Sequence, residues 1–193
     1  MFGRAPALRI ETERLVLRPP EHRDWRRWAE LREASAAHLK PWEPTWSHDH
    51  LTRRAFTNRV YWAQRAVRQE TALPLFLFER GGGFVGAVTL DNIRRGPAQA
   101  GTTGYWLGTP HTGKGLMTEA LSAVVAHAFE ALDLSRIESG CLPENAASRA
   151  VLERVGYKYE GVAQSYLQIG GRWRNHVLYA RLRHDRRGRT DAG

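Results

Sequence analysis

Residues 102–132, TTGYWLGTPHTGKGLMTEALSAVVAHAFEAL, carry the strongest structural signal in the chain. Residues 102–107 read as a short strand, and the loop that follows contains Gly108, Gly113 and Gly115. From Leu116 onward, apolar residues recur at helical spacing over roughly four turns. The stretch therefore predicts a strand, a glycine-rich turn and a long amphipathic helix.

The composition of this turn suggests an anion site. Glycine lets the backbone approach a ligand closely, and the unpaired N–H groups and dipole of the helix start favour negative charge. Lys114 adds a positive side chain. The spacing fits neither a P-loop nor a dinucleotide fingerprint. The turn predicts a pyrophosphate cradle, and a glycine-rich helix entry without ligand is the alternative.

Elements on both sides of this stretch predict one α/β domain. The predicted strands are residues 12–18, 73–78, 84–90, 102–107, 136–142, 157–169 (broken midway) and 173–182, and the helices are residues 20–35, 51–70, 116–132 and 146–155. This order predicts one mixed sheet with helices on its faces in a single domain, residues 1–183. The basic tail, residues 184–193, has no apolar pattern and is predicted to be disordered.

Composition limits the classes of function. The single cysteine, Cys141, excludes an intrachain disulfide and a cysteine-rich metal site, and we expect it to pack in a buried strand. No apolar run approaches the length of a membrane span, so we expect a cytoplasmic protein with no membrane contact. The net charge of +9 favours polyanionic partners such as a ribosome or RNA, although a high-GC genome that encodes arginine freely also explains it. We interpret Arg23, Arg26, Arg27 and Arg32 as a solvated helix face, with ribosomal RNA contact as the alternative.

The segment GYWLG…HTGKGLMTEAL resembles the cofactor motif of the GNAT N-acetyltransferases. Residues 112–117 stand where that family has an [RQ]xxGx[GA] turn for the pyrophosphate of acetyl-coenzyme A, with Thr112 and Met117 departing from the pattern. The resemblance implies acetyl-coenzyme A as cosubstrate, no metal, and these cofactor-binding residues: Trp106, Leu107, Gly108, Thr112, Gly113, Lys114, Gly115, Leu116, Met117, Thr118, Asn145 and Ser148.

Three further segments resemble the RimJ/RimL-type ribosomal-protein N-acetyltransferases. These are PENAASRAVLERVGYKYEG (143–161), YLQIGGRWRNHVLYA (166–180) and LKPWEP (39–44), with the opening MFG (1–3). The resemblance covers residues 8–182. It implies a splayed, mostly antiparallel seven-stranded sheet with helices on both faces. It also implies acetyl transfer to the N-terminal alanine of a small-subunit ribosomal protein, by a monomer or dimer.

The resemblance further implies direct attack of the amine on the thioester, with no acyl-enzyme. The sheet should splay between residues 102–107 and 136–142, and a backbone N–H near Trp106 or Leu107 should hold the carbonyl oxygen. Ser148 is the expected catalytic residue for the leaving thiolate, and Asn145 should bond the pantetheine arm; a role in starting the helix is the alternative for both. The tyrosine that many relatives use for the thiolate is replaced by Leu152.

On the acceptor side we expect Trp42, Glu43, Trp46 and Tyr166, with core packing as the alternative for the aromatic residues. Many relatives carry a glutamate base where this chain has Thr102 and Thr103. An α-amine, with a pKa of about 7.7–8.0, needs only a modest base, and Glu43, Asp91 and Glu160 are possible helpers. Two alternatives stay open: a small-molecule amine acceptor such as an antibiotic or polyamine, and a non-catalytic coenzyme A-binding or ribosome-binding module.

Overall fold

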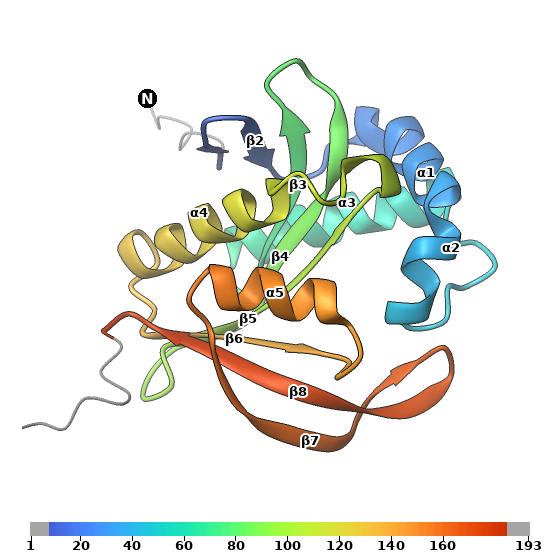
Figure 1. Cartoon of the computed structure of the whole chain (residues 1–193). Helices are drawn as coiled ribbons and strands as arrows, with labels where there is room; N and C mark the ends of the chain where they lie inside the picture. The colour runs from blue at the N-terminus through green and yellow to red at the C-terminus, as the bar shows by residue number, and fades with distance from the viewer. Residues whose placement is uncertain (1–7, 185–193) are drawn as a thin grey trace, which may run out of the picture.

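An eight-stranded sheet forms the centre of the fold in the computed structural model, which describes residues 8–184 (Figure 1). The strand order is β1-β2-β3-β4-β5-β6-β8-β7, and every neighbouring pair is antiparallel except β5 and β6. The strands are β1 (Ile10–Glu11), β2 (Leu15–Arg18), β3 (Leu73–Glu79), β4 (Phe84–Arg94), β5 (Ala100–Leu107), β6 (Arg136–Cys141), β7 (Lys158–Ile169) and β8 (Arg172–Leu182). The helices are α1 (Trp25–Ala34), α2 (Ala36–Leu39), α3 (Arg53–Arg68), α4 (Leu116–Glu130) and α5 (Ala146–Arg154), with 3₁₀ turns at His22–Asp24, Lys40–Trp42 and Thr109–His111.

The predicted class, a mixed and mostly antiparallel α/β sheet, is confirmed, but the predicted count of seven strands is wrong. The eighth strand is β1, whose two residues pair with β2 through Ile10 opposite Leu17. Two residues are too few to show the alternation from which a strand is recognised. The predicted strand 12–18 is shorter for a related reason, because the Thr12 hydroxyl accepts from the Leu15 N–H at 3.0 Å and turns the chain before β2.

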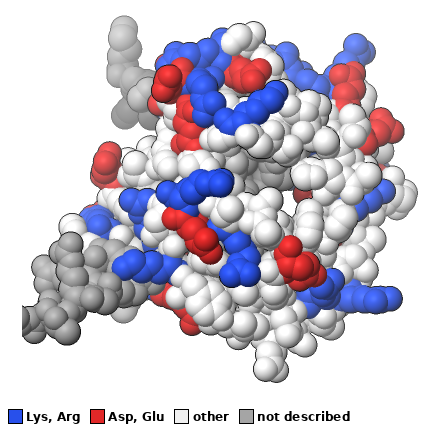
Figure 2. Space-filling view, in the orientation of Figure 1, with Lys and Arg blue, Asp and Glu red and all other residues white. Residues whose placement is uncertain are grey.

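Helices cover both faces of the sheet, as predicted (Figure 1). α4 and α5 lie on one face, where lysine and arginine are interspersed with aspartate and glutamate (Figure 2). α1 and α3 lie on the opposite face. There, Trp28 of α1 and Phe56 of α3 pack against Phe76 of β3, with ring centroids 5.1 Å apart for the first two. β3 is buried along almost its whole length because helices cover both of its faces.

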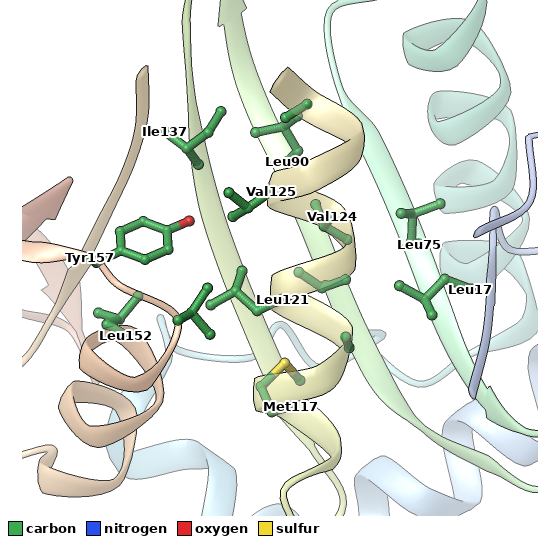
Figure 3. Close-up of a cluster of buried hydrophobic side chains, with 14 of the residues drawn as sticks. Leu17, Leu75, Leu90, Met117, Leu121, Val124, Val125, Ile137, Leu152 and Tyr157 are labelled. Carbon is green, nitrogen blue, oxygen red and sulfur yellow. The ribbon is translucent and has the colours of Figure 1, made fainter. Parts of the chain in front are cut away.

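The larger core lies between the sheet and α4 (Figure 3). Leu121, Val124 and Val125 of α4 are buried, and Val125 lies beside Leu90 of β4 and Ile137 of β6. The apolar stripe read from the sequence is therefore the face that α4 presents to the sheet. Leu152 is also fully buried here, so the position where relatives carry a tyrosine is core in this chain.

The splay predicted from the resemblance is present between β5 and β6. These strands pair only from Ala100–Arg136 to Thr103–Ser139, and beyond that point β5 pairs with β4 alone. The first half of β5 is thus fixed between two neighbours, and residues 104–107 have an open edge. The predicted break in the strand at 157–169 is also present, as register shifts between Tyr159 and Gly161 and between Ala163 and Leu167.

Within residues 8–184, none of the helices has the length and apolar character to cross a membrane. The opening residues 1–3 and residues 185–193 of the basic tail lie outside the described part of the chain.

Candidate active site

A cavity of about 1680 Å³ enters the sheet at the splay between β5 and β6. Its opening is a hollow near the middle of the face shown in Figure 2, rimmed mainly by uncharged residues. Most of the predicted site residues line it: Trp42, Glu43, Trp106, Leu107, Thr112, Gly113, Gly115, Leu116, Met117, Thr118, Asn145, Ser148 and Tyr166. Gly108, Lys114 and Trp46 do not. The structure therefore brings predicted site residues that are up to 124 positions apart in the sequence to one cavity.

The glycine turn has the geometry of an anion cradle. Gly113 and Gly115 adopt φ values of +74° and +75°, in the left-handed region where other residues are strained. Within residues 8–184, the N–H groups of Gly113, Lys114 and Gly115 make no hydrogen bond. They precede the start of α4, whose dipole adds partial positive charge. The turn can therefore bind a pyrophosphate through its backbone, with the exposed Lys114 beside it.

An ion pair far apart in the sequence holds this turn in place. Arg14 donates to the Lys114 carbonyl at 2.9 Å and pairs with Glu119 at 2.6 Å. The Thr12 hydroxyl donates to Glu119 at 2.5 Å. Although partial burial acts to raise the pKa of Glu119, these bonds from Thr12 and Arg14 outweigh it and lower the pKa. The contact of Glu119 with the β1–β2 connection was not predicted, because in the sequence Glu119 is only one residue of the GNAT-like segment.

Gly108 has a structural role. It is buried, and its N–H donates to the Val85 carbonyl at 3.0 Å. A Cβ at this position would lie 2.4 Å from a methyl group of Leu31. Glycine is therefore required here because the end of β5 approaches α1 closely.

The alternation of β5 decides which backbone groups face the splay. Because the Gly108 N–H faces β4, the N–H and C=O of Trp106 face β4 as well, and the Trp106 oxygen indeed lies against Gly86. The backbone groups of Tyr105 and Leu107 point the other way, as does the Thr103 carbonyl, which accepts from Ser139 at 2.9 Å. Of the two N–H groups expected to hold the thioester oxygen, only that of Leu107 faces the cavity.

The Ser148 hydroxyl lies in a small polar cluster. It is 3.0 Å from the Tyr105 hydroxyl, which also donates to the Ser148 carbonyl at 3.1 Å. Burial raises the pKa of Tyr105, so its hydroxyl stays protonated. Burial also raises the pKa of the Cys141 thiol, and the neighbouring Ser148 hydroxyl offsets part of that rise. Sequence analysis placed Tyr105 only in a strand, because no motif links it to a helix 43 residues away.

Asn145 caps α5 in the structure. Its side-chain oxygen accepts from the Ser148 N–H at 3.0 Å, which is the local role considered as the alternative to cofactor binding. Its amide nitrogen has no partner among the described residues, and the residue lines the cavity. The cap also orients the first turn of α5, and with it Ser148.

On the other face of β5, an arginine and a glutamate form a buried pair. Arg32, expected on a solvated helix face, is only 5% exposed, because it turns inward to meet Glu43. Glu43 accepts from Arg32 with both oxygens and from the Trp46 indole at 2.6 Å. The Arg32 guanidinium lies 4.5 Å from the Trp46 ring centroid and 4.7 Å from that of Trp106.

The other acceptor-side candidates separate into two groups. Trp42 and Tyr166 line the cavity, and Tyr166 is 45% exposed at its edge. Trp46 instead stacks on His50, with ring centroids 4.7 Å apart. Burial, and after it the charge of Arg32, lowers the pKa of His50 to about 4. Trp46 therefore contacts both members of the Arg32–Glu43 pair and does not line the cavity.

The possible helper carboxylates also differ in their surroundings. Glu43 is engaged as described, and Glu160 pairs with Arg136. Asp91 lines the cavity, and among residues 8–184 it accepts only the N–H of Asn92, at 2.7 Å. Within the described part of the chain, no three His, Cys, Asp or Glu side chains gather as metal ligands would.

Comparisons with known proteins agree with this geometry. A family model described as an acetyltransferase (GNAT) domain matches residues 14–158. The [ribosomal protein uS5]-alanine N-acetyltransferase of Escherichia coli K12 is 35% identical over 184 residues, which cover 93% of this chain and 95% of that protein.

The chain is also similar to solved structures of ribosomal-protein N-acetyltransferases. RimJ of Mycobacterium smegmatis, in complex with a coenzyme A disulfide, has a TM-score of 0.83 and 35% identity, covering 88% of this chain and 82% of that one. A ribosomal-protein-S5-alanine acetyltransferase from Vibrio fischeri has a TM-score of 0.86 and 30% identity, covering 92% and 98%. On this domain match and on a relative aligned along nearly its whole length, the chain belongs to the GNAT family of acetyl-coenzyme A-dependent N-acetyltransferases.

Proposed function

We propose that this enzyme acetylates the α-amine of a protein N-terminus, and that its acceptor is the N-terminal alanine of a small-subunit ribosomal protein. One observation carries the proposal. The cavity runs through the splayed sheet, from the glycine turn and Ser148 to the Arg32–Trp106 wall on the opposite face of β5. The printed activities of the relatives in E. coli and V. fischeri support this choice of acceptor.

The cofactor and the acceptor approach β5 from opposite faces. Acetyl-coenzyme A supplies an activated acetyl thioester, and the N–H groups of the glycine turn bind its pyrophosphate. The open edge of residues 104–107 offers backbone partners for the pantetheine arm. The Leu107 N–H then donates to the thioester oxygen as negative charge develops during attack. The acceptor enters from the side lined by Trp42, Trp106 and Tyr166.

The reaction forms an N–C bond and breaks the C–S bond of the thioester. The Ser148 hydroxyl donates a hydrogen bond to the departing thiolate, and Tyr105 supports it, since its own hydroxyl lies 3.0 Å from Ser148 Oγ. This pair does the work of the tyrosine that relatives carry at the position of Leu152. The amine loses its proton to water. Among the described carboxylates that line the cavity, Asp91 is the one without an arginine or lysine partner.

A site with only a weak general base favours an α-amine over a lysine side chain as the acceptor. At pH 7 roughly 10–15% of an α-amine with a pKa of about 7.8 is neutral, against about 0.04% of a lysine side chain. A lysine acceptor would therefore cost roughly 3 kcal/mol more to deprotonate. A site without a dedicated base suits the first acceptor better.

The test is thiol release from acetyl-coenzyme A with short peptides. Matched peptides begin with a free alanine, with an Nα-acetylated alanine, or with an Nα-acetylated alanine followed by a lysine. We expect turnover only with the free alanine, and an added mass of one acetyl group at the first residue. Turnover of the blocked lysine peptide would overturn the α-amine proposal. Binding of acetyl-coenzyme A without turnover of any peptide would favour a small-amine acceptor or a non-catalytic role.

A further inference from the structure

The outward face of α3 is rich in arginine. The helix has the sequence RRAFTNRVYWAQRAVR, with five arginines and no aspartate or glutamate. Phe56, Val60, Ala63 and Ala66 are buried against the sheet. At 100° per residue, the opposite side presents Arg54, Asn58, Tyr61, Arg65 and Arg68, all exposed. We call these five residues the α3 basic face. It spans about 21 Å along the helix axis.

In the described part of the chain, the three arginines of this face have no ion-pair partner. Eleven arginines outside α3 form ion pairs with aspartate or glutamate. Among residues 8–184, Arg54, Arg65 and Arg68 form none. Glu70, just after the helix, is already paired with Arg95. In the same range, Arg26, Arg154 and Arg172 are also exposed without an ion pair, but on α3 three such arginines share one face of a single helix. The face with α4 and α5 mixes both signs (Figure 2).

Helix stability does not explain the pattern either. Arg65 and Arg68 lie near the C-terminal end, where the helix dipole favours a cation. Arg54 lies in the first turn, where the dipole disfavours one, and no acidic residue is present there. Interaction with the helix dipole therefore does not explain the arginine at position 54.

An aromatic ring lies between these charges. Tyr61 is 55% exposed and is held in place by His22, whose ring contacts it edge-on at 5.3 Å. Trp62, beside it on the helix, is 43% exposed. Arginines that reach phosphates, with an exposed ring on which a base can stack, form the combination that binds RNA with unpaired bases.

We propose that the α3 basic face is a docking surface for RNA, with Arg54, Arg65 and Arg68 on phosphates and Tyr61 on an unpaired base. The cavity reaches α3 next to this surface, because Arg59 and Trp62 of the same helix line it. RNA on this face would lie beside an acceptor entering the cavity. The RNA contact itself does not depend on acetyl transfer.

The experiment measures binding of the full-length protein to a fluorescent 20-nucleotide single-stranded RNA, at several salt concentrations. The test variant is Arg54→Gln, Arg65→Gln and Arg68→Gln together. The matched control is Arg9→Gln, Arg172→Gln and Arg174→Gln, which removes the same charge outside α3. We expect the test variant to bind at least about tenfold more weakly, with the slope of log K against log salt smaller by about 2. The control should change binding little, and Tyr61→Ala should weaken it by about fivefold or more.

Thermal melting should change little in the α3 variants because these side chains are exposed. Binding of acetyl-coenzyme A should be unchanged because none of them lines the cavity. Absence of RNA binding by the parent protein, or equal losses in the test and control variants, would overturn the proposal. So would binding of polyglutamate at matched charge as tightly as RNA, since the partner would then be an acidic polypeptide.

Discussion

The Tyr105 hydroxyl lies 3.0 Å from the Ser148 hydroxyl across the mouth of the splay, so β5 and α5 share one polar contact at the open edge of the sheet. Tyr105 is near the point where β5 loses its second neighbour, and Ser148 is on the first turn of α5. The α5 cap through Asn145 fixes one partner and the sheet fixes the other. A serine held in this way is positioned before any substrate binds.

Replacing Ser148 tests its role at the thiolate. We expect Ser148→Ala to lower kcat by about 100-fold, the size of a typical acid–base contribution. The KM for acetyl-coenzyme A should change little, because the substitution leaves the glycine turn, the proposed pyrophosphate site, unaltered. Ser122→Ala, on the exposed side of α4, is the matched control and should leave kcat unchanged. Steady-state kinetics with saturating peptide decides the matter, and an unaltered kcat in Ser148→Ala would remove the assigned role.

The pH profile tests the state of Tyr105. The rate should rise through the pKa of the α-amine, about 7.7–8.0, as the neutral amine becomes available. Burial raises the pKa of Tyr105 above its ordinary value, so the hydroxyl remains protonated and the rate should stay level up to about pH 10. Tyr105→Phe should lower this plateau by roughly tenfold and keep the rising limb. A fall in the parent enzyme's rate between pH 8 and pH 10 would contradict this account.

The strands and helices were predictable where their patterns are long. The stripe of α4 repeats over four turns by the sequence count, and β3 has an almost unbroken apolar run because it is buried on both faces. β1 was missed because a two-residue strand is defined only by its partner, Leu17 opposite Ile10. The splay was expected from family resemblance alone, since no local pattern reports where β5 and β6 separate.

The site was predictable where it depends on local backbone geometry. The glycine residues at positions 113 and 115 predict a turn with left-handed backbone conformation, which the structure has. Side-chain partners far apart in sequence could not be read in the same way. Arg32 looked like one more exposed arginine of α1, and only the fold places Glu43 and two tryptophan rings around it. Tyr105 was likewise hidden, because its partner lies on another element.

The clamp on the glycine turn should govern cofactor affinity. Arg14→Gln removes the bond to the Lys114 carbonyl and the pair with Glu119, so the turn must be ordered when the cofactor binds. We expect a rise of about fivefold in the KM for acetyl-coenzyme A, which corresponds to roughly 1 kcal/mol. At saturating cofactor, kcat should be unchanged. Arg9→Gln, which breaks the exposed pair with Glu11, is the control and should leave the KM unaffected.

The buried pair of Arg32 and Glu43 should stabilise the fold only as a pair. Arg32→Ala leaves Glu43 without its partner at a site where the two side chains are 6% and 21% exposed. We expect the free energy of unfolding to fall by about 3 kcal/mol, which lowers Tm by roughly 6–12 °C in a chain of this size. The double variant Arg32→Met and Glu43→Leu removes both charges and keeps the volume, so it should recover most of the loss. Thermal melting of the two variants measures this directly, and a double variant as unstable as the single one would show that the loss comes from packing around Trp106 and Trp46. Steady-state kinetics of the double variant tests a second role of the pair, which is to shape the acceptor side of the cavity. The double variant should fold but have a higher KM for the acceptor peptide.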